Sequence, residues 1–292
     1  MMKDKAPRAY ARGIFKYFSE RNPPKHYPPS HKASEGYPLS STNSRSWSSA
    51  KADKFAIVTG ASTGIGRAIA IAFAKKRAKV ALVARTKDRL QQTKDLVEKA
   101  GGQAEIFPAD LSKLDSINDL ISRIKSKTKK VDILVNVAGI WHGENEVYAA
   151  RDFADFPQQV ILDTYFVGII APTILTHAFV PLMGKGSKII NISGTFESGA
   201  KGWLPYYVSK RAIEDLTVGL SEELKEKEIH VNAISPSDTA TDAYKKYFPQ
   251  YLEEAIKPEE IAAYAVYLCE NNLSGKVTVL KKDKEPFESF HR

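Results

Sequence analysis

Two residues in the second half of the chain, Tyr206 and Lys210, have the types and spacing needed for proton transfer. Residues four apart on a helix share one face, so the phenol and the ammonium group would point the same way. A free tyrosine has a pKa of about 10, and a nearby ammonium group lowers it by stabilising the phenolate. The pair could therefore exchange a proton with an alcohol or a ketone, although the same spacing is common on plain helix surfaces. Tyr207 is the competing tyrosine, but its direction on the helix differs by about 100°.

A glycine-rich turn at residues 59–66, Thr-Gly-Ala-Ser-Thr-Gly-Ile-Gly, follows an apolar run at residues 55–58. Ile65, Ile69 and Phe73 then recur with helical periodicity. A helix N-terminus carries unpaired N–H groups and partial positive charge, so it can hold a phosphate. Glycines let the backbone approach that phosphate closely. A plain turn is the alternative, but the position between a strand and a helix favours a nucleotide-binding turn.

The end of the second predicted strand indicates which dinucleotide would bind. An acid placed about 20 residues beyond the glycines would bind the ribose 2′-hydroxyl of NAD. Here the chain reads Val83-Ala84-Arg85-Thr86-Lys87, with no acid before Asp88. A guanidinium binds a 2′-phosphate through charge-assisted hydrogen bonds. We therefore expect NADP(H) with Arg85 at the 2′-phosphate; the alternative is that Arg85 is a solvated charge at the end of a strand.

Strand-like and helix-like segments alternate along the chain. This pattern is typical of an α/β protein with a doubly wound, Rossmann-like parallel sheet covered by helices on both faces. The predicted strands are residues 55–58, 80–84, 104–107, 131–135, 188–192, 230–234 and 277–280. The predicted helices begin after the glycine turn and also span residues 114–124, 158–183, 206–227 and 259–270.

Composition separates an N-terminal extension, residues 1–50, from a single catalytic domain, residues 51–292. The extension holds six of the 15 prolines and a charge of +6 out of the net +9, so we expect it to be disordered. Because the basic charge is largely confined there, we expect no nucleic-acid partner. Tyr10, Ile14 and Phe18 could form a basic amphipathic helix for organelle import or a membrane surface; a solvated tail is the alternative. We expect a cytoplasmic protein unless that signal acts.

Two further features limit the function classes. A single cysteine, Cys269, excludes an internal disulfide framework and a multi-cysteine zinc site, and we expect no metal. Residues 160–183 are apolar enough to span a bilayer. Asp163, His177 and two prolines would be costly in lipid, so a buried or interface-forming helix is the better interpretation, and we expect no transmembrane segment.

Taken together, these motifs resemble the short-chain dehydrogenase/reductase family in its single-domain branch, over about residues 54–280. Residues 59–66 match TGxxxGxG, and Asp110 matches the acid that meets the adenine. Residues 134–139, Leu-Val-Asn-Val-Ala-Gly, are similar to LVNNAG, and residues 236–241 to PGxxxT with Ser237 for glycine. Ser193 matches the catalytic serine, and Tyr206 with Lys210 matches YxxxK.

The resemblance implies an NADP(H)-dependent enzyme that interconverts a carbonyl and a secondary alcohol. Tyr206 would be the general acid and base, Lys210 would lower its pKa and hold the nicotinamide ribose, and Ser193 would hydrogen-bond the reacting oxygen. Thr241 would meet the nicotinamide carboxamide. The implied cofactor-binding residues are Gly60, Ser62, Thr63, Gly64, Ile65, Gly66, Arg85, Asp110, Leu111, Asn136, Ala138, Gly139, Tyr206, Lys210, Pro236, Thr239 and Thr241.

Three departures from the family pattern bear on this expectation. Tyr165 stands where the family places an asparagine that supports a proton relay. Gly194 follows Ser193 where many members have a second serine, which leaves Thr195 as the alternative hydroxyl. The C-terminal segment lacks the family's frequent glycines, which weakens the expectation of tetramer contacts. The second function hypothesis follows from the first two departures: a nucleotide-binding sensor or scaffold with reduced or no catalysis.

Aromatic residues surround the expected site near Tyr206: Trp141, His142, Phe196, Trp203, Tyr244, Tyr247, Phe248 and Tyr251. They favour an apolar or ring-bearing carbonyl substrate; loop packing is the alternative. The family resemblance also implies a homodimer or homotetramer through the helices at residues 158–183 and 206–227.

Overall fold

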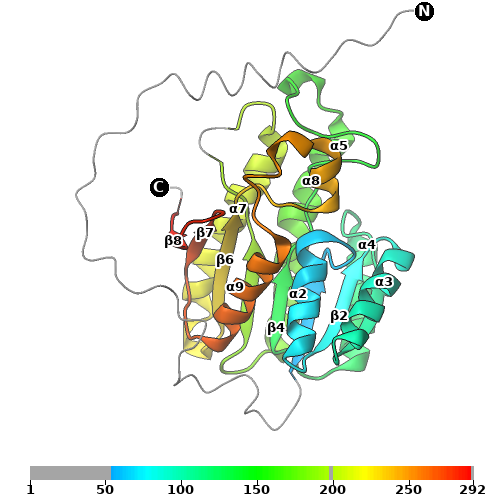
Figure 1. Ribbon diagram of the computed structural model, residues 1–292. Helices are drawn as coiled ribbons and strands as arrows, with labels where there is room; N and C mark the ends of the chain where they lie inside the picture. The colour runs from blue at the N-terminus through cyan, green and yellow to red at the C-terminus, as the bar shows by residue number, and fades with distance from the viewer. Residues whose placement is uncertain (1–53, 197–199, 291–292) are drawn as a thin grey trace, which may run out of the picture.

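The computed structural model describes residues 54–196 and 200–290. The expectations for the N-terminal extension, residues 1–50, lie outside the described residues. The described part is built around one sheet with helices on both sides (Figure 1). Its strands are β1 Phe55–Thr59, β2 Lys79–Ala84, β3 Gln103–Pro108, β4 Ile133–Asn136, β5 Lys188–Ile192, β6 His230–Pro236, β7 Val277–Leu280 and β8 Phe287–Glu288.

The sheet has the strand order β3-β2-β1-β4-β5-β6-β7-β8. Every pairing from β3 to β7 is parallel, and only the short edge strand β8 is antiparallel, opposite β7. The chain leaves β1 toward β2 and β3, then returns to β4 on the other side of β1. This reversal opens a crevice at the carboxyl ends of the central strands, where ligands bind in such sheets. The expected doubly wound, Rossmann-like fold is confirmed.

Eight α-helices of the described residues surround the sheet: α2 Gly64–Lys75, α3 Lys87–Lys99, α4 Leu114–Lys127, α5 Gln158–Tyr165, α6 Ala171–Phe179, α7 Leu204–Glu223, α8 Asp242–Tyr247 and α9 Pro258–Glu270. Two apolar cores divide six of these helices between the two faces of the sheet. One core joins α2, α3 and α9 to the sheet, and the other joins α4, α6 and α7 to the opposite face. Side chains along β1 alternate between the two faces of the sheet, so Val58 packs in the first core and Ile57 in the second.

The observed elements differ from the predicted ones at three helical segments, and the short edge strand β8 was not predicted either. Helix α3 was not predicted, because it is strongly polar and buries only Leu90, Thr93 and Val97. Helix α8 is six residues long, too short for a periodic signal. The helix predicted at residues 158–183 is interrupted by a π-helical turn, Phe166–Ile170, between α5 and α6. Gly168 lies in that turn, where an added Cβ would come 2.8 Å from the Ser209 Cβ on α7.

The interrupted helix, Gln158–Leu182, is long and apolar enough to cross a membrane by length and composition. In this fold its buried side chains include Val167, Ala171, Leu175 and Phe179, which belong to one of the two cores. Part of its apolar surface therefore covers the sheet, while Leu162 and Ile170 are 53% and 39% exposed.

Candidate active site

A cavity of about 860 Å³ lies at the carboxyl ends of the central strands. It collects residues that are far apart in the sequence: the glycine turn after β1, the ends of β2 to β6, helix α7, and the loop that leads into α8. Nearly all of the predicted site residues line it: Gly60, Ser62, Thr63, Gly64, Ile65, Gly66, Arg85, Asp110, Leu111, Ala138, Gly139, Ser193, Tyr206, Lys210, Pro236, Thr239 and Thr241.

The glycine turn is shaped to bring backbone close to a ligand. Gly60 has φ +64°, and a Cβ on Gly66 would come 2.3 Å from the Gly60 carbonyl oxygen, so glycine is required at both positions. Helix α2 begins at Gly64 with no acid in its first turn and no side-chain cap from Thr63. Its first N–H groups thus remain available to an anion, and the turn fits the phosphates of a dinucleotide.

Two charged residues, Arg85 after β2 and Asp110 after β3, also line this cavity. Burial works to raise the pKa of Asp110, but hydrogen bonds from Ser112 and the positive charges of Arg85 and Lys113 hold it below its ordinary value. The Ser112 hydroxyl and backbone N–H both donate to one carboxylate oxygen, at 2.8 and 3.1 Å. Asp110 is therefore ionised and held in place, and Arg85 supplies positive charge next to it.

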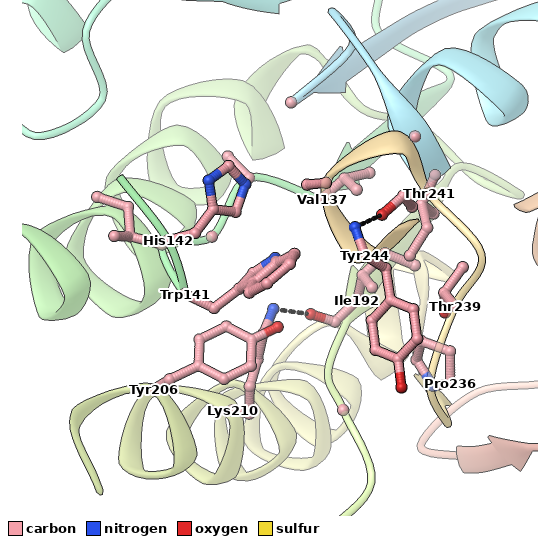
Figure 2. Close-up of a pocket in the computed structure, with 18 of the residues that line it drawn as sticks. Val137, Trp141, His142, Ile192, Tyr206, Lys210, Pro236, Thr239, Thr241 and Tyr244 are labelled. Carbon is pink, nitrogen blue, oxygen red and sulfur yellow. Dashed lines mark hydrogen bonds between the residues drawn. The ribbon is translucent and has the colours of Figure 1, made fainter. Parts of the chain in front are cut away.

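Tyr206 and Lys210 extend from α7 into the cavity (Figure 2). The Lys210 Nζ lies 5.3 Å from the centroid of the Tyr206 ring and donates a 2.7 Å hydrogen bond to the Ile192 carbonyl oxygen. Tyr207 is outside the cavity lining; its ring packs against Phe196, with centroids 5.2 Å apart. The structure therefore brings Tyr206, rather than Tyr207, to the lysine and the glycine turn.

Burial dominates the protonation of this pair. It raises the pKa of the Tyr206 phenol well above its ordinary value of 10. It lowers the pKa of Lys210 to about 8, against the opposing effect of Glu214. The sequence-based expectation of a lowered tyrosine pKa is therefore wrong for this arrangement. At neutral pH the phenol carries its proton and the lysine carries its charge, which suits proton donation to a carbonyl oxygen.

Ser193 requires a correction, because its hydroxyl is not presented to the Tyr206 phenol. Its Oγ lies 2.6 Å from Glu214 Oε1 and 3.0 Å from the Lys210 carbonyl oxygen, and the residue is buried. Both partners belong to the body of α7. The alternative hydroxyl, Thr195, donates to the Pro236 carbonyl oxygen at 3.2 Å. Neither hydroxyl is arranged as the donor to the reacting oxygen that the resemblance implied.

Asn136 also departs from its predicted role as a cofactor ligand. It is buried at the end of β4 and does not line the cavity. Its Nδ2 donates a 2.8 Å hydrogen bond to Asn191 Oδ1 on β5, so it ties two central strands together. Tyr165, at the position of the family's relay asparagine, ends α5 and does not line the cavity either.

Thr241 connects the cofactor end of the cavity to α8. Its hydroxyl accepts a 3.2 Å hydrogen bond from the Tyr244 backbone N–H and thereby caps the helix. A hydroxyl that accepts in this way keeps its own proton. Thr241 can therefore still donate a hydrogen bond into the cavity, as its predicted role requires.

Aromatic rings form one wall of the cavity beside Tyr206. Trp141 stacks on Phe248 with centroids 6.2 Å apart, and Trp203 lies 5.9 Å from Phe248 and 6.3 Å from Tyr206. Lys246 Nζ and the Tyr247 hydroxyl both donate to the Glu144 carbonyl oxygen, at 3.0 and 3.2 Å. These contacts join α8 to the loop after β4 and keep the aromatic wall in place.

Sequence reasoning missed several groups that the fold brings to the site. Arg89 lines the cavity, as Arg85 does, four residues further along the chain. Asp238 also lines it and accepts a hydrogen bond from Tyr244, an aromatic residue that was expected at the site; burial raises the pKa of both groups. Glu214 is fully buried beneath Lys210. A signal was present only for Glu214, which follows Lys210 by four residues and so shares its helix face.

The cavity combines a glycine turn with a tyrosine–lysine pair at the edge of a doubly wound sheet. This combination is typical of oxidoreductases that bind a dinucleotide cofactor. A family model described as short chain dehydrogenase matches residues 54–252. The chain is 34% identical over 223 residues to a fatty acyl-CoA reductase from Acinetobacter baylyi, covering 73% of this chain and 72% of that protein. It is 33% identical over 251 residues to a 3beta-hydroxysteroid dehydrogenase from Mediterraneibacter gnavus, covering 81% and 85%.

Solved structures agree. A short chain dehydrogenase from Burkholderia cenocepacia in complex with NADP has a TM-score of 0.69 and 27% identity, over 78% of this chain and 96% of that one. The angucycline C-6 ketoreductase LanV with bound NADP has a TM-score of 0.69 and 26% identity, over 77% and 93%. The chain belongs to the short-chain dehydrogenase/reductase family.

Proposed function

We propose that this protein is an NADP(H)-dependent oxidoreductase that interconverts a carbonyl and a secondary alcohol, with Tyr206 as general acid and base. One observation carries the proposal. The Tyr206–Lys210 pair lines the same cavity as a glycine turn that fits phosphate and an arginine at the end of β2. Proton transfer and dinucleotide binding would thus take place in one continuous space.

The residues present fit the cofactor. The backbone N–H groups at the start of α2 would hold the pyrophosphate, Asp110 would meet the adenine, and Arg85 would hold the 2′-phosphate. Ala84 at the end of β2 leaves no carboxylate to repel that phosphate. NADP supplies the hydride chemistry when bound. The NADP complexes of similar structures support this choice.

Tyr206 would donate its proton to the oxygen of the carbonyl as negative charge develops there, or remove it from the alcohol in reverse. Lys210 would place a positive charge beside that oxygen and stabilise the phenolate left after proton donation. Its hydrogen bond to the Ile192 carbonyl oxygen fixes the ammonium group before substrate arrives. Such preorganised charge needs no rearrangement during the reaction.

We further infer an apolar, ring-bearing carbonyl as the substrate. Trp141, Trp203 and Phe248 present ring faces and edges beside Tyr206, and aromatic walls bind flat apolar rings well. The names of two similar proteins, a hydroxysteroid dehydrogenase and an angucycline ketoreductase, support this class of substrate.

Turnover of a panel of ketones with NADPH, followed by loss of NADPH absorbance, tests the proposal. Tyr206→Phe removes only the hydroxyl, so it should lower turnover by about 10²–10⁴-fold while NADPH titration by fluorescence stays unchanged. Tyr207→Phe is the matched control and should keep normal turnover. Full activity of Tyr206→Phe would reject the mechanism.

A second candidate function, a nucleotide-binding sensor or scaffold, is favoured by one observation: the Ser193 hydroxyl is hydrogen-bonded to Glu214 rather than directed to the phenol. NADPH binding without turnover of any ketone, aldehyde or alcohol in the panel would support this alternative. Turnover that depends on Tyr206 would exclude it.

A further inference from the structure

A carboxylate is buried one helical turn beyond the catalytic lysine. Glu214 is 0% exposed, in the middle of α7. Its Oε2 lies 2.7 Å from Arg211 Nη1, and its Oε1 lies 2.6 Å from the Ser193 hydroxyl on the opposite segment. An ionised carboxylate removed from water is stable only with such partners. The fold therefore maintains this buried charge with contacts from two elements.

The Ser193 hydroxyl donates its hydrogen bond to the Glu214 carboxylate. A serine hydroxyl has one proton to donate, and Ser193 Oγ has two acceptors within reach: Glu214 Oε1 at 2.6 Å and the Lys210 carbonyl oxygen at 3.0 Å. The shorter contact has the length of a charge-assisted O–H···O⁻ bond. Donation to a substrate oxygen would leave the Glu214 carboxylate without this donor in a buried position.

Position 194, not position 193, faces the side chain of Lys210. A Cβ built on Gly194 would lie 3.8 Å from Lys210 Cγ and 3.6 Å from the Phe196 ring, both ordinary contacts. Successive side chains of an extended segment point to opposite sides, so the Ser193 hydroxyl is directed toward Glu214 whereas position 194 faces Lys210, although both residues line the cavity. In this chain the segment after β5 thus presents no hydroxyl at the position that faces the lysine.

The charges around Lys210 are few among the described residues. On α7 they are Glu214, which favours the ammonium form, and Arg211, which is paired with Glu214, together with the neutral phenol of Tyr206. From β5 the Nζ meets the Ile192 carbonyl oxygen, and from the loop after β4 it faces Gly139, where an added Cβ would lie 3.3 Å from it. Since burial alone disfavours a charged lysine, the carboxylate is the group that offsets it.

Resting on the proposed function, we propose that Glu214 is a positioning residue for catalysis: its buried carboxylate keeps the charge on the Lys210 ammonium group and holds the Ser193 hydroxyl away from the substrate. Ser193 is accordingly a support of Glu214 and not the donor to the reacting oxygen. The substrate oxygen then relies on Tyr206 and the charge of Lys210.

The first experiment needs no turnover. NMR of the protein with ¹³C-labelled lysine, with Lys210 assigned by Lys210→Met, follows the titration of its side chain in the wild type and in Glu214→Gln. The glutamine amide keeps an oxygen acceptor and the size of the side chain but has no charge. The titration midpoint of Lys210, about 8 in the wild type, should therefore fall by about one pH unit. Glu222→Gln, an exposed change on the same helix, should leave it in place. An unmoved midpoint in folded Glu214→Gln would overturn the proposal.

The second experiment tests Ser193 with the ketone that the wild type turns over fastest. Loss of an oxyanion donor lowers turnover by about 10²–10³-fold. For Ser193→Ala we expect less than a tenfold loss, because this hydroxyl is already hydrogen-bonded to Glu214 and does not serve the substrate oxygen. A loss of a hundredfold or more would overturn the assignment. If instead Tyr206→Phe retains activity, the proposed function fails while the Lys210 titration still reports on Glu214.

Discussion

Thr241 packs directly against Gly64: a Cβ on that glycine would come 2.8 Å from the Thr241 Cγ2. The contact joins the glycine turn after β1 to the loop after β6, and both residues line the cavity. Gly64 also has φ +53°, a conformation that disfavours any side chain. The cofactor end of the site is therefore closed by two segments that fit only while position 64 has no side chain.

Gly64→Ala should weaken NADPH binding and lower the free energy of unfolding, by more than the roughly 1 kcal/mol expected from backbone strain alone. Gly101→Ala is the matched control, since Gly101 has φ +86° but nothing within 4 Å of an added Cβ. Thr241→Ser removes the clashing methyl and keeps the helix cap, so it should restore part of the loss in the double variant. Denaturant unfolding and NADPH titration measure both effects; equal losses for the two alanine variants would contradict the packing argument.

Arg85→Glu should reverse the preference between the two dinucleotides. A charged hydrogen bond contributes about 1.5–3 kcal/mol, so NADPH affinity should fall by about 10–150-fold, while NADH affinity should hold or improve. Lys87→Glu makes the same charge change two residues away, outside the cavity lining, and should alter neither affinity strongly. Isothermal titration with both cofactors provides the comparison. A wild type that prefers NADH would contradict the assignment.

The rate of ketone reduction should decrease as pH rises through about 8, the pKa of Lys210. The sign follows from the ammonium form, which is present below that pKa and lost above it. Because burial raises the pKa of Tyr206, the phenol keeps its proton over this pH range, so its ionisation causes no second decrease in the pH–rate profile. Each further pH unit should reduce kcat/KM by about tenfold. A profile that stays level to pH 10 would show that the lysine charge is not used.

The family resemblance predicts that the protein pairs through the helices at residues 158–183, which include α5 and α6, and 206–227, which lie largely in α7. Exposed apolar side chains lie on these elements and on the π-helical turn between α5 and α6: Leu162 is 53% exposed, Val208 36% and Ile170 39%. Leu162→Arg would bury an unpaired charge at such an interface and should yield a monomer. Leu114→Arg, at a 48% exposed leucine on α4, is the control. Light scattering decides, and a monomeric wild type would contradict the prediction.

The sequence alone was sufficient for the features that depend on local order. Alternating strands and helices predicted the parallel sheet, because a buried strand reads as a short apolar run and a covering helix as a 3.6-residue period. The glycine turn and the tyrosine–lysine pair could be found for the same reason: a few residues of fixed spacing determine their geometry. Arg85 was identified by its place at the end of a strand.

Only the tertiary structure decided what each side chain contacts. Ser193 and Asn136 occupy motif positions, yet their side chains form hydrogen bonds with Glu214 and Asn191. The motifs could not predict these partners, because residues that meet across a sheet or between a strand and a helix are distant in sequence. The protonation of Tyr206 likewise followed from burial, which spacing cannot reveal. Spacing determines which residues can meet along one element, whereas burial and cross-element contacts determine their charge and direction, and these exist only after the chain has folded.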